Sequence, residues 1–558
     1  MMKKLTLTLC LVASVLSMFA QPEKLITSSA AGVGTTTWSK DTVYKIKGFV
    51  FVNPGQVLTI QPGTVIKADT GSSTNATAFI VARGGKLIAN GTAQEPIIFT
   101  SVLEDFSDPF ALDEKGGLWG GMIILGNATI NTAPAEKEVE GLPTGDPRNK
   151  YGAIAGATND ADSSGVLRYV SIRYSGSALG ANNEIQGLTL AGVGSKTVID
   201  YVEIIYSTDD GIEFFGGKVG VKHAIVAFVD DDCYDYDQGF SGKGQFWFAL
   251  QKQTVGADRV NEWDGADDPE LGTPFAIPTI YNATFLGLGP AVGSNRMITF
   301  RANAGGKLYN SILAQQGRGI DIEIKGDSDD SYTRYQVGDI DVRKNIFWEI
   351  GTTATVQANV GVSPIARTWA GVDSAAIVSA ANKYVDSVMA ANNVYADPKF
   401  VSISRAEDSK ALDPRAPGFA AQSDLYPYND PWFTPVTYKG AFALDALWMK
   451  GWTHLDERGY LPATVSAVTS IDNRQLTATL NVYPNPSNGS FTVTAAELSA
   501  EPVQITVLNA MGQEVYAAAA NTVAGELSQS LTLNLSAGVY MVKVQQGDKQ
   551  SAKQIVIK

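Results

Sequence analysis

The chain has 558 residues, a formal charge of −14 at pH 7 and a sequence pI of about 4.8. This length exceeds one ordinary hydrophobic core and predicts two or three folded units. The acidic balance argues against nucleic acid or an anionic surface as a partner. With two cysteines and 55 glycines, and with few long helical periodicities, the chain lacks a disulfide framework and favours an all-β fold.

Residues 1–20 have the pattern of a signal peptide. Lys3 and Lys4 precede an apolar stretch at 5–19, and Ala20 offers a plausible cleavage point. The stretch is too short to span a bilayer stably. We therefore expect residues 1–20 to be removed, and the rest of the sequence predicts no transmembrane segment in the mature chain.

Residues 33–350 carry short β-rich runs at a loose period of twenty-odd residues, which is typical of a solenoid. The run at 169–175, Tyr-Val-Ser-Ile-Arg-Tyr-Ser, recurs 32 positions later at 201–207 and, weakened, another 22 later at 223–229. Such intervals suit one coil of three short strands. The sequence therefore predicts a right-handed parallel β-helix, a pectin-lyase-like solenoid, over 33–350.

The first coils show how the core should form. Buried parallel strands need nearly continuous apolar residues. The residues expected to point inward are Val57, Leu58, Ile60, Val65, Leu87, Ile97 and Phe99.

Residues 351–465 are less regular and are predicted to form a capping region, with a short helix within 371–393. A solenoid exposes strand edges and apolar ladders at its end. The aromatic-rich segment near 438–456 is predicted to cover that end, and aromatic sugar binding is the alternative. Its candidate residues are Phe442, Leu447, Trp448 and Trp452. Residues 466–480, rich in Thr, Ser and Ala, read as a linker.

Residues 481–558 alternate short strands with Pro, Asn and Gly turns, as a small immunoglobulin-like β-sandwich requires. The motifs are Asn-Val-Tyr-Pro-Asn-Pro at 481–486, the run Ile-Thr-Val-Leu-Asn-Ala-Met-Gly-Gln-Glu-Val at 505–515, and Leu-Ser-Ala-Gly-Val-Tyr at 535–540. They resemble the type A C-terminal sorting domain of the Bacteroidetes type IX secretion system. The resemblance implies export to the outer-membrane cell surface or the extracellular space, with the type IX machinery and surface lipopolysaccharide as partners.

The central region carries a second resemblance. The runs Asp-Asp-Gly-Ile-Glu-Phe-Phe-Gly at 209–216, Asp-Asp-Asp-Cys-Tyr-Asp-Tyr-Asp at 230–237, and 438–456 carry it. Together they resemble a Bacteroidetes family of surface parallel β-helix proteins of undefined activity.

Asp209 and Asp231 lie 22 positions apart, which is one coil, so their carboxylates should stack about 5 Å apart at one corner. Like charges at that spacing need a cation or a raised pKa. Ca²⁺ accepts several oxygen ligands without strict geometry. The sequence therefore offers a calcium site with four candidate ligands, Asp209, Asp231, Asp232 and Asp235. Solvated aspartates in turns are the alternative.

A catalytic interpretation uses the same cluster. The runs at 208–211 and 231–233 resemble the paired acidic motifs of β-helix polygalacturonases, in which carboxylates perform inverting hydrolysis. That resemblance implies acid and base roles for Asp209, Asp210, Asp231 and Asp232. The sequence lacks the Gly-His-Gly turn and the Arg-Ile-Lys strand of those enzymes. A calcium-dependent lyase would instead need a basic partner from Arg259, Arg296, Arg301 or Arg318.

Trp247 and Trp263 stand among polar residues and are candidates for glycan contact, whereas burial inside a strand is the alternative. Taken together, the sequence predicts an exported cell-surface β-helix protein with a non-enzymatic structural, adhesion or glycan-binding role. The alternative is a polysaccharide-degrading enzyme, either an inverting glycosidase or a calcium-dependent lyase, that uses the acidic cluster at 209–237.

Overall fold

The computed structural model describes residues 21–180, 184–252, 259–266, 269–291, 295–325, 330–351, 360–364, 374–468, 480–496, 498–509, 513–547 and 549–558. The expected signal peptide and most of the expected linker lie outside these residues. The described chain forms two compact units. The first comprises residues up to 416 together with 420–467, and the second comprises mainly residues 468–558.

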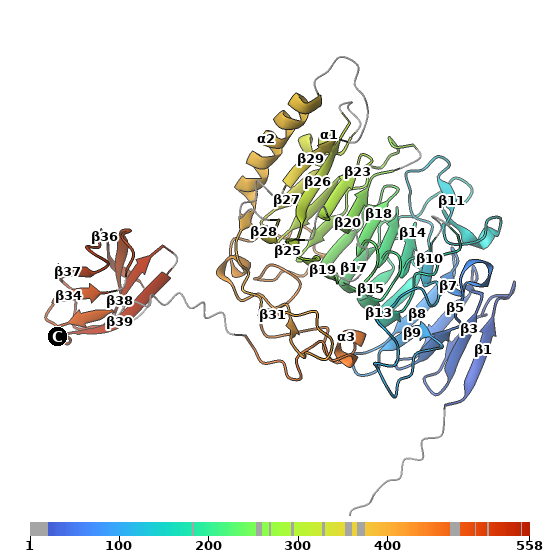
Figure 1. Cartoon of the computed structure of the whole chain (residues 1–558), viewed down its shortest axis with the longest axis horizontal. Helices are drawn as coiled ribbons and strands as arrows, with labels where there is room; N and C mark the ends of the chain where they lie inside the picture. The colour runs from blue at the N-terminus through green and yellow to red at the C-terminus, as the bar shows by residue number, and fades with distance from the viewer. Residues whose placement is uncertain are drawn as a thin grey trace, which may run out of the picture. The chain divides into compact units, whose positions relative to one another are not determined.

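The first unit is a parallel β-helix with three parallel sheets along its length (Figure 1). Sheet 1 contains β2 (Thr36–Trp38), β5 (Val57–Ile60), β8 (Lys86–Asn90), β21 (Thr279–Tyr281), β24 (Gly306–Tyr309) and β27 (Ile340–Arg343). Sheet 2 contains β1 (Glu23–Thr27), β3 (Val43–Lys47), β6 (Val65–Ala68), β9 (Ile97–Ser101), β22 (Thr284–Leu286), β25 (Ile312–Gln316), β28 (Ile346–Ile350) and β30 (Val394–Tyr395). Sheet 3 contains β4 (Phe49–Val52), β7 (Ala78–Val81), β10 (Met122–Leu125), β14 (Leu188–Ala191), β16 (Ile212–Phe215), β18 (Tyr234–Asp237), β20 (Arg259–Asp264), β23 (Arg296–Arg301), β26 (Arg318–Ile324) and β29 (Val360–Pro364).

Four long strands run through sheet 1 and continue into sheet 2. They are β13 (Gly165–Arg173), β15 (Val198–Ile205), β17 (Gly220–Ala227) and β19 (Lys243–Leu250). Their register confirms the coil length predicted from the repeats, because Val170 pairs with Val202 and Val202 pairs with Ala224. Each repeat is therefore one coil.

An aromatic column forms where these four strands turn from sheet 1 into sheet 2. Tyr169, Tyr201, His223 and Phe246 each have a positive φ, between 46° and 60°. Their rings stack in chain order with centroid distances of 4.4, 4.1 and 4.7 Å. A left-handed backbone is unfavourable for such bulky residues, and the stacking offsets that cost. In the next two coils Asn282 and Asn310, which tolerate this conformation, stand at the bend.

The interior of the β-helix is a continuous apolar core. Of the residues expected to point inward, Leu58, Ile60, Leu87, Ile97 and Phe99 are buried in it. Val57 and Val65 are half-buried and lie outside this core, because β5 and β6 alternate and leave the inward positions to their even-numbered residues.

A helix covers the C-terminal end of the solenoid. The helix α2 (Ser374–Asn392) contacts β27 and β29, and its Ala381, Val385 and Met389 belong to the core. The capping predicted for Phe442, Leu447, Trp448 and Trp452 is wrong. Those residues belong to a separate cluster on the outer face of the middle coils, where Trp448 and Trp452 contact Tyr201. The sequence marks them as apolar but does not indicate which surface they cover.

Smaller elements complete the first unit. They are the helices α1 (Ser331–Gln336) and α3 (His454–Glu457), and the antiparallel pairs β11 (Glu136–Glu138) with β12 (Lys150–Gly152) and β31 (Ser402–Ile403) with β32 (Leu412–Asp413). Among the described residues, no helix combines the length and hydropathy needed to cross a membrane.

The second unit is a small β-sandwich of two antiparallel sheets. One sheet contains β33 (Asn481–Tyr483), β34 (Ser490–Ala495) and β37 (Leu527–Thr532). The other contains β36 (Glu514–Ala520), β35 (Val503–Leu508), β38 (Gly538–Gln546) and β39 (Lys549–Ile557). Its core takes Phe491 and Val493 from one sheet and Ile505, Val507 and Val544 from the other, as the predicted sandwich requires.

Candidate functional site

The outer face of sheet 3 carries a row of carboxylates. The parallel register places Glu213 of β16 beside Asp235 of β18, and Asp235 beside Glu262 of β20. Side chains on a strand alternate between its two faces. Tyr234 and Tyr236 therefore point into the core while Asp235 and Asp237 face outward. Neighbouring strands lie about 4.8 Å apart, so these acids are held close together.

The turns that precede β16 and β18 add five more aspartates. One carboxylate oxygen from each of Asp209, Asp210 and Asp231 lies within 4.8 Å of the other two. Asp210, Glu213 and Asp235 form a second group within the same limit. Asp210 belongs to both groups and therefore joins the turn to the strand row. We call the five residues of these two groups the acidic cluster.

Burial and mutual repulsion shift the acidic cluster towards the protonated form. Burial, followed by the charge of Asp231, raises the pKa of Asp209 to about 7. Burial, followed by Asp232 and Asp209, raises the pKa of Asp210 well above its ordinary value. The same holds for Glu213, where Glu140 adds to burial. Loss of hydration destabilises the ionised form of each carboxyl. A bound cation would stabilise the ionised form of all three carboxyls.

Two carboxylate oxygens of the acidic cluster have no hydrogen-bond partner among the described residues. Glu213 is 7 % exposed, and its Oε2 is buried without a hydrogen bond. Oδ1 of Asp235, its neighbour in the strand row, is also buried without one. Buried polar atoms are nearly always satisfied, so two adjacent orphaned oxygens point to a ligand.

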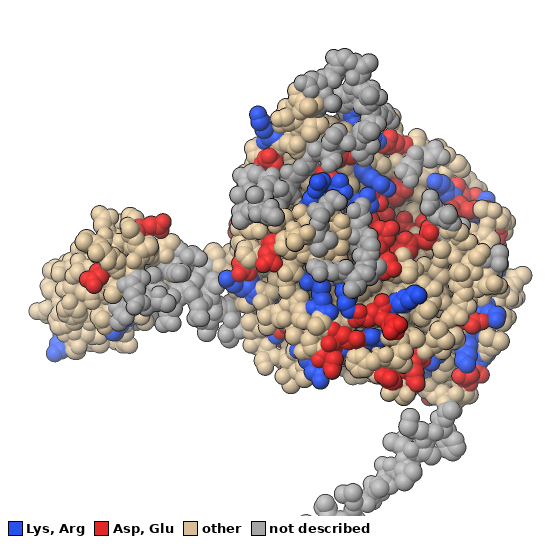
Figure 2. All heavy atoms as spheres, in the orientation of Figure 1, with Lys and Arg blue, Asp and Glu red and all other residues tan. Residues whose placement is uncertain are grey.

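Positive side chains border the acidic cluster on the β20 and β23 side. Arg259 lies 2.7 Å from Glu262, and Arg301 lies 3.1 Å from Glu262 and 2.7 Å from Asp264. Burial alone would lower the pKa of Arg301, but Asp264 and Glu262 more than offset it and the net shift is upward. Figure 2 shows Asp and Glu gathered in the middle of this surface, with Lys and Arg directly beside them.

The structure separates the sequence candidates into distinct environments. Asp209 and Asp231 lie together with Asp210, which is a catalytic candidate that was not among the expected metal ligands. Asp235 belongs to the second group instead, and Asp232 lies 3.7 Å from Arg259. Glu213 was missed. Its only signal is a single acid in the apolar run at 212–215.

The glycan contact predicted for Trp247 and Trp263 is wrong. Both side chains are fully buried in the core of the β-helix. Trp247 stacks on Tyr234 at 4.6 Å, and Trp263 stacks on Tyr236 at 5.2 Å. Neither ring can offer a face to a sugar without unfolding the coil.

A third group of possible ligands, Glu104, His454 and Glu457, has a different character. The guanidinium of Arg173 lies 2.8 Å from Glu104 and 2.7 Å from Glu457 and is completely buried. A cation there would have to displace a buried arginine. This group is therefore structural.

Comparison with known proteins agrees with both units. Residues 31–392 match the pectate-lyase like beta helix domain, and residues 481–558 match the secretion system C-terminal sorting domain. A comparison with curated proteins finds no match. The sorting domain implies export by the type IX system to the cell surface or the extracellular space. The chain therefore belongs to the pectate-lyase-like β-helix family and ends in a type IX sorting domain.

Proposed function

We propose that this exported protein is a non-enzymatic, cation-dependent binding protein of the cell surface. A divalent cation, best matched by Ca²⁺, would occupy the acidic cluster and attract the anionic groups of an extracellular polysaccharide. The observation that carries the proposal is the buried Glu213: among the described residues its Oε2 has no hydrogen-bond partner, and it belongs to a group of carboxylates that lie within 4.8 Å of one another.

The chemistry of the donors supports calcium. All five members of the acidic cluster are carboxylates, which are hard oxygen ligands of the kind that Ca²⁺ prefers. The cluster has no histidine or cysteine, which would favour zinc. Its members come from a turn and from a strand face, and Ca²⁺ tolerates such irregular geometry better than Mg²⁺ does.

A polysaccharide-degrading enzyme is the second candidate. The specific observation in its favour is Asp209, because a carboxyl with a pKa of about 7 suits a general acid near neutral pH. The lyase form of this candidate has less support. A lyase base must accept a proton, whereas Asp264 and Glu262 favour the protonated form of Arg301.

The two candidates separate in one paired experiment. Thermal unfolding of the chain from Gln21 onward would be followed with Ca²⁺, with Mg²⁺ and with a chelator. Tryptophan fluorescence reports on the β-helix unit, because all nine tryptophans precede residue 468. In parallel, acidic polysaccharides would be incubated with the protein and assayed for reducing ends and unsaturated products.

A calcium-dependent rise in melting temperature without product supports the binding function. The rise should disappear in Asp209→Asn/Asp231→Asn and persist in Asp113→Asn, which changes an exposed aspartate elsewhere. Product release that Asp209→Asn abolishes would establish the enzyme instead. A melting temperature that no cation changes would refute the calcium site.

A further inference from the structure

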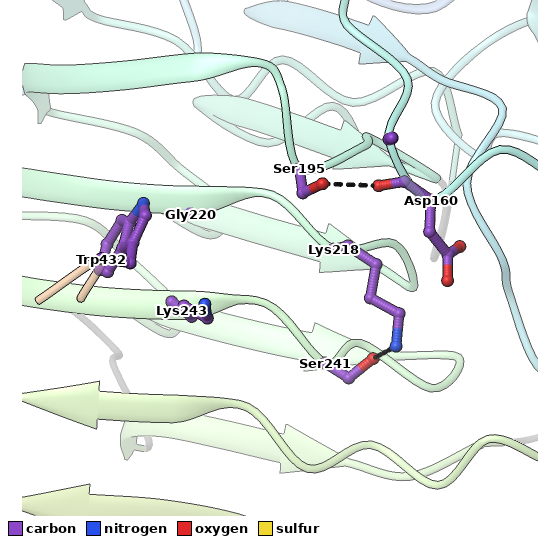
Figure 3. Close-up of a pocket in the computed structure, with 8 residues that line it drawn as sticks. Asp160, Ser195, Lys218, Gly220, Ser241, Lys243 and Trp432 are labelled. Carbon is purple, nitrogen blue, oxygen red and sulfur yellow. Dashed lines mark hydrogen bonds between the residues drawn. The ribbon is translucent and has the colours of Figure 1, made fainter. Parts of the chain in front are cut away.

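A hollow of about 310 Å³ lies at the corner between sheets 3 and 1, away from the acidic cluster. Successive coils line it with residues from their turns, and one aromatic side chain comes from the segment at 424–434. The lining residues are Asp160, Ala161, Ser195, Lys218, Gly220, Ser241, Lys243 and Trp432 (Figure 3). Its volume falls at the small end of the range for ligand sites, which suits one sugar residue.

Two of the lining residues of the hollow are lysines, Lys218 and Lys243. Lys218 reaches the next coil, where its Nζ donates a hydrogen bond of 2.7 Å to Oγ of Ser241. Among the described residues, no carboxylate lies within ion-pair distance of Lys218. Lys243 is paired with Asp430 at 2.5 Å. Lys218 therefore brings a charge that is solvated by a neutral hydroxyl and remains available to an anion.

The aromatic wall of the hollow is held in place by a glycine. A Cβ added to Gly220 would lie 2.5 Å from Cζ2 of Trp432, so the indole rests directly on the backbone of β17. Nζ of Lys222 lies 4.7 Å from the ring centroid, and the backbone N–H of Trp432 donates to Asp430 at 2.8 Å. The half-exposed ring is thus fixed beside the lysines (Figure 3).

Hydroxyl groups and a carboxylate complete the lining. Oγ of Ser195 donates to the backbone carbonyl of Asp160 at 2.8 Å, and the hydroxyl of Ser241 accepts from Lys218. A flat aromatic ring beside polar donors and acceptors is the usual composition of a site for a small polar ligand. The ammonium of Lys218, for which the described residues offer no ion pair, favours a ligand with a negative group.

We propose that this hollow binds one anionic sugar residue, whose ring packs on Trp432 and whose carboxylate or sulfate group is held by Lys218. Ser195, Ser241 and Asp160 face the sugar hydroxyls. The site is independent of the acidic cluster and needs no metal, so it would hold an anionic glycan directly.

The test is a titration of the chain from Gln21 onward with monosaccharides at low ionic strength in the presence of a chelator, followed by calorimetry and saturation-transfer NMR. The ligands are glucuronic acid, a sulfated glucose, neutral glucose and inorganic sulfate. We expect one or both anionic sugars to bind and neutral glucose not to bind. The chelator empties the acidic cluster, so failure here is separable from failure of the cation-dependent function.

Three variants assign the binding to the hollow. Lys218→Gln should weaken it about tenfold or more, since a hydrogen bond to a charged group is lost. Gly220→Ala should displace the indole of Trp432 and so remove the saturation transfer to the sugar ring. Trp432→Ala should have the same effect by deleting the indole. Lys86→Gln, an exposed lysine of β8, is the matched control and should bind like the parent.

Three results would overturn the proposal. The anionic sugars fail to bind the parent chain, or Lys218→Gln binds as tightly as Lys86→Gln. In the third result, inorganic sulfate binds as tightly as the sulfated sugar, and Trp432→Ala leaves the affinity for the sulfated sugar unchanged. The hollow would then be a simple anion site. Melting curves of each variant, compared with the parent, show whether a loss reflects unfolding.

Discussion

Glu203 of β15 accepts a hydrogen bond of 2.8 Å from the backbone N–H of His454, a residue 251 positions later in the chain. Ser171 donates from the preceding coil to the same oxygen, Oε2, at 2.6 Å, and the other oxygen accepts from the N–H of Leu455 at 3.1 Å. These contacts anchor the segment that crosses the outer face of sheet 2. Burial raises the pKa of Glu203 to about 7, although Arg173 and the two N–H groups oppose the shift.

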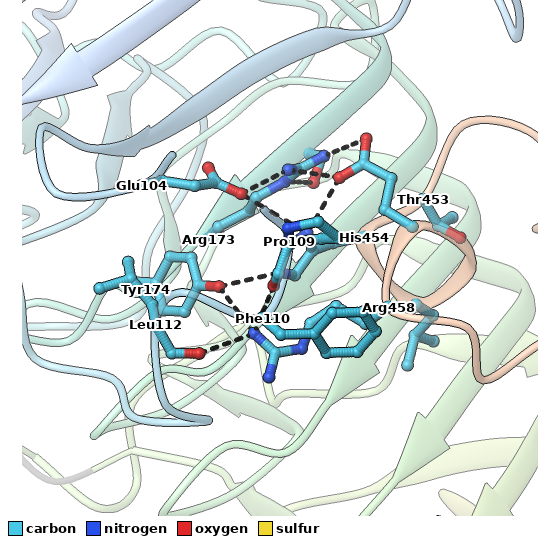
Figure 4. Close-up of polar contacts among 12 residues, drawn as sticks. Glu104, Pro109, Phe110, Leu112, Arg173, Tyr174, Thr453, His454 and Arg458 are labelled. Carbon is cyan, nitrogen blue, oxygen red and sulfur yellow. Dashed lines mark hydrogen bonds and ion pairs between the residues drawn. The ribbon is translucent and has the colours of Figure 1, made fainter. Parts of the chain in front are cut away.

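Arg173 ties the same segment to a third part of the chain. Figure 4 shows its guanidinium between Glu104 and the segment that carries His454. Burial lowers the pKa of His454 to about 4, so its imidazole is neutral and Nε2 can hydrogen-bond to the hydroxyl of Tyr174 at 2.9 Å. Arg173 and His454 are buried at the centre of this network, which makes the removal of one partner costly.

Glu203→Ala should therefore destabilise the β-helix unit by about 3–5 kcal/mol, because it removes three hydrogen bonds and leaves Arg173 with less compensation. Glu203→Gln should cost only about 1 kcal/mol, because an amide resembles the protonated carboxyl that is already populated near pH 7. Urea denaturation followed by tryptophan fluorescence measures both. Equal losses in the two variants would contradict the pKa assigned to Glu203.

Glu213→Gln should leave the stability of the metal-free protein nearly unchanged, since burial and the charge of Glu140 already favour the neutral carboxyl, which an amide resembles. The same variant should lose the calcium-dependent rise in melting temperature. Asp113→Asn serves as the control and should keep that rise. A metal-free Glu213→Gln protein less stable than the parent would mean that the carboxylate makes a favourable contact within the fold.

Calcium should reverse the pH dependence of stability near neutrality. The pKa of Asp209 is about 7 in the folded protein and near 3.8 when unfolded, so the folded state binds more protons in between. Without a cation, stability should decline as pH rises from about 4 to about 7. With Ca²⁺, which needs deprotonated ligands, the stabilisation should grow over the same interval.

Melting temperatures at several pH values from 4 to 8, with calcium and with chelator, test this prediction. The two curves should diverge as pH rises towards 8. Asp209→Asn should make the metal-free curve less steep in this window, and Glu203, whose pKa is also about 7, should supply part of the remaining slope. Parallel curves for the parent protein would exclude cation binding at Asp209.

Tyr201 tests the aromatic column. Tyr201→Asn and Tyr201→Val both remove the ring stacked between Tyr169 and His223, but the backbone there has φ of 57°. Asparagine tolerates that conformation and valine does not. Tyr201→Val should therefore be less stable than Tyr201→Asn by about 1–2 kcal/mol in urea denaturation. Equal stabilities would show that the bend relaxes when the ring is removed.

Sequence repeats predicted the coils because each coil repeats the same buried positions. Within the matching runs at 169–175 and 201–207, residues 170–173 pair in order with residues 202–205 in the sheet. The pairing also explains why Asp209 and Asp231, one coil apart, lie together. The spacing of the repeats is therefore enough to predict which residues of neighbouring coils lie side by side.

The error at Trp247 has a physical cause. The strand β19 bends at Phe246, whose φ is 60°, so the inward positions shift by one from Gly244 to Trp247. A prediction that assumes strict alternation of side chains along a strand does not detect such a bend. The position of the segment at 438–456 was also beyond prediction, because its contact with sheet 2 depends on residues more than 200 positions away. Glu203, Arg173 and Trp432 gain their roles only through such contacts.

The two halves of the acidic cluster come from different coils, with Asp209, Asp210 and Glu213 on one and Asp231 and Asp235 on the next. An unfolded chain does not hold these oxygens together, so a cation that binds them binds the native state alone. If the proposed cation binds there, its concentration outside the cell would set part of the stability of the fold. At a hundredfold excess over the dissociation constant it would add about 2.7 kcal/mol of stability.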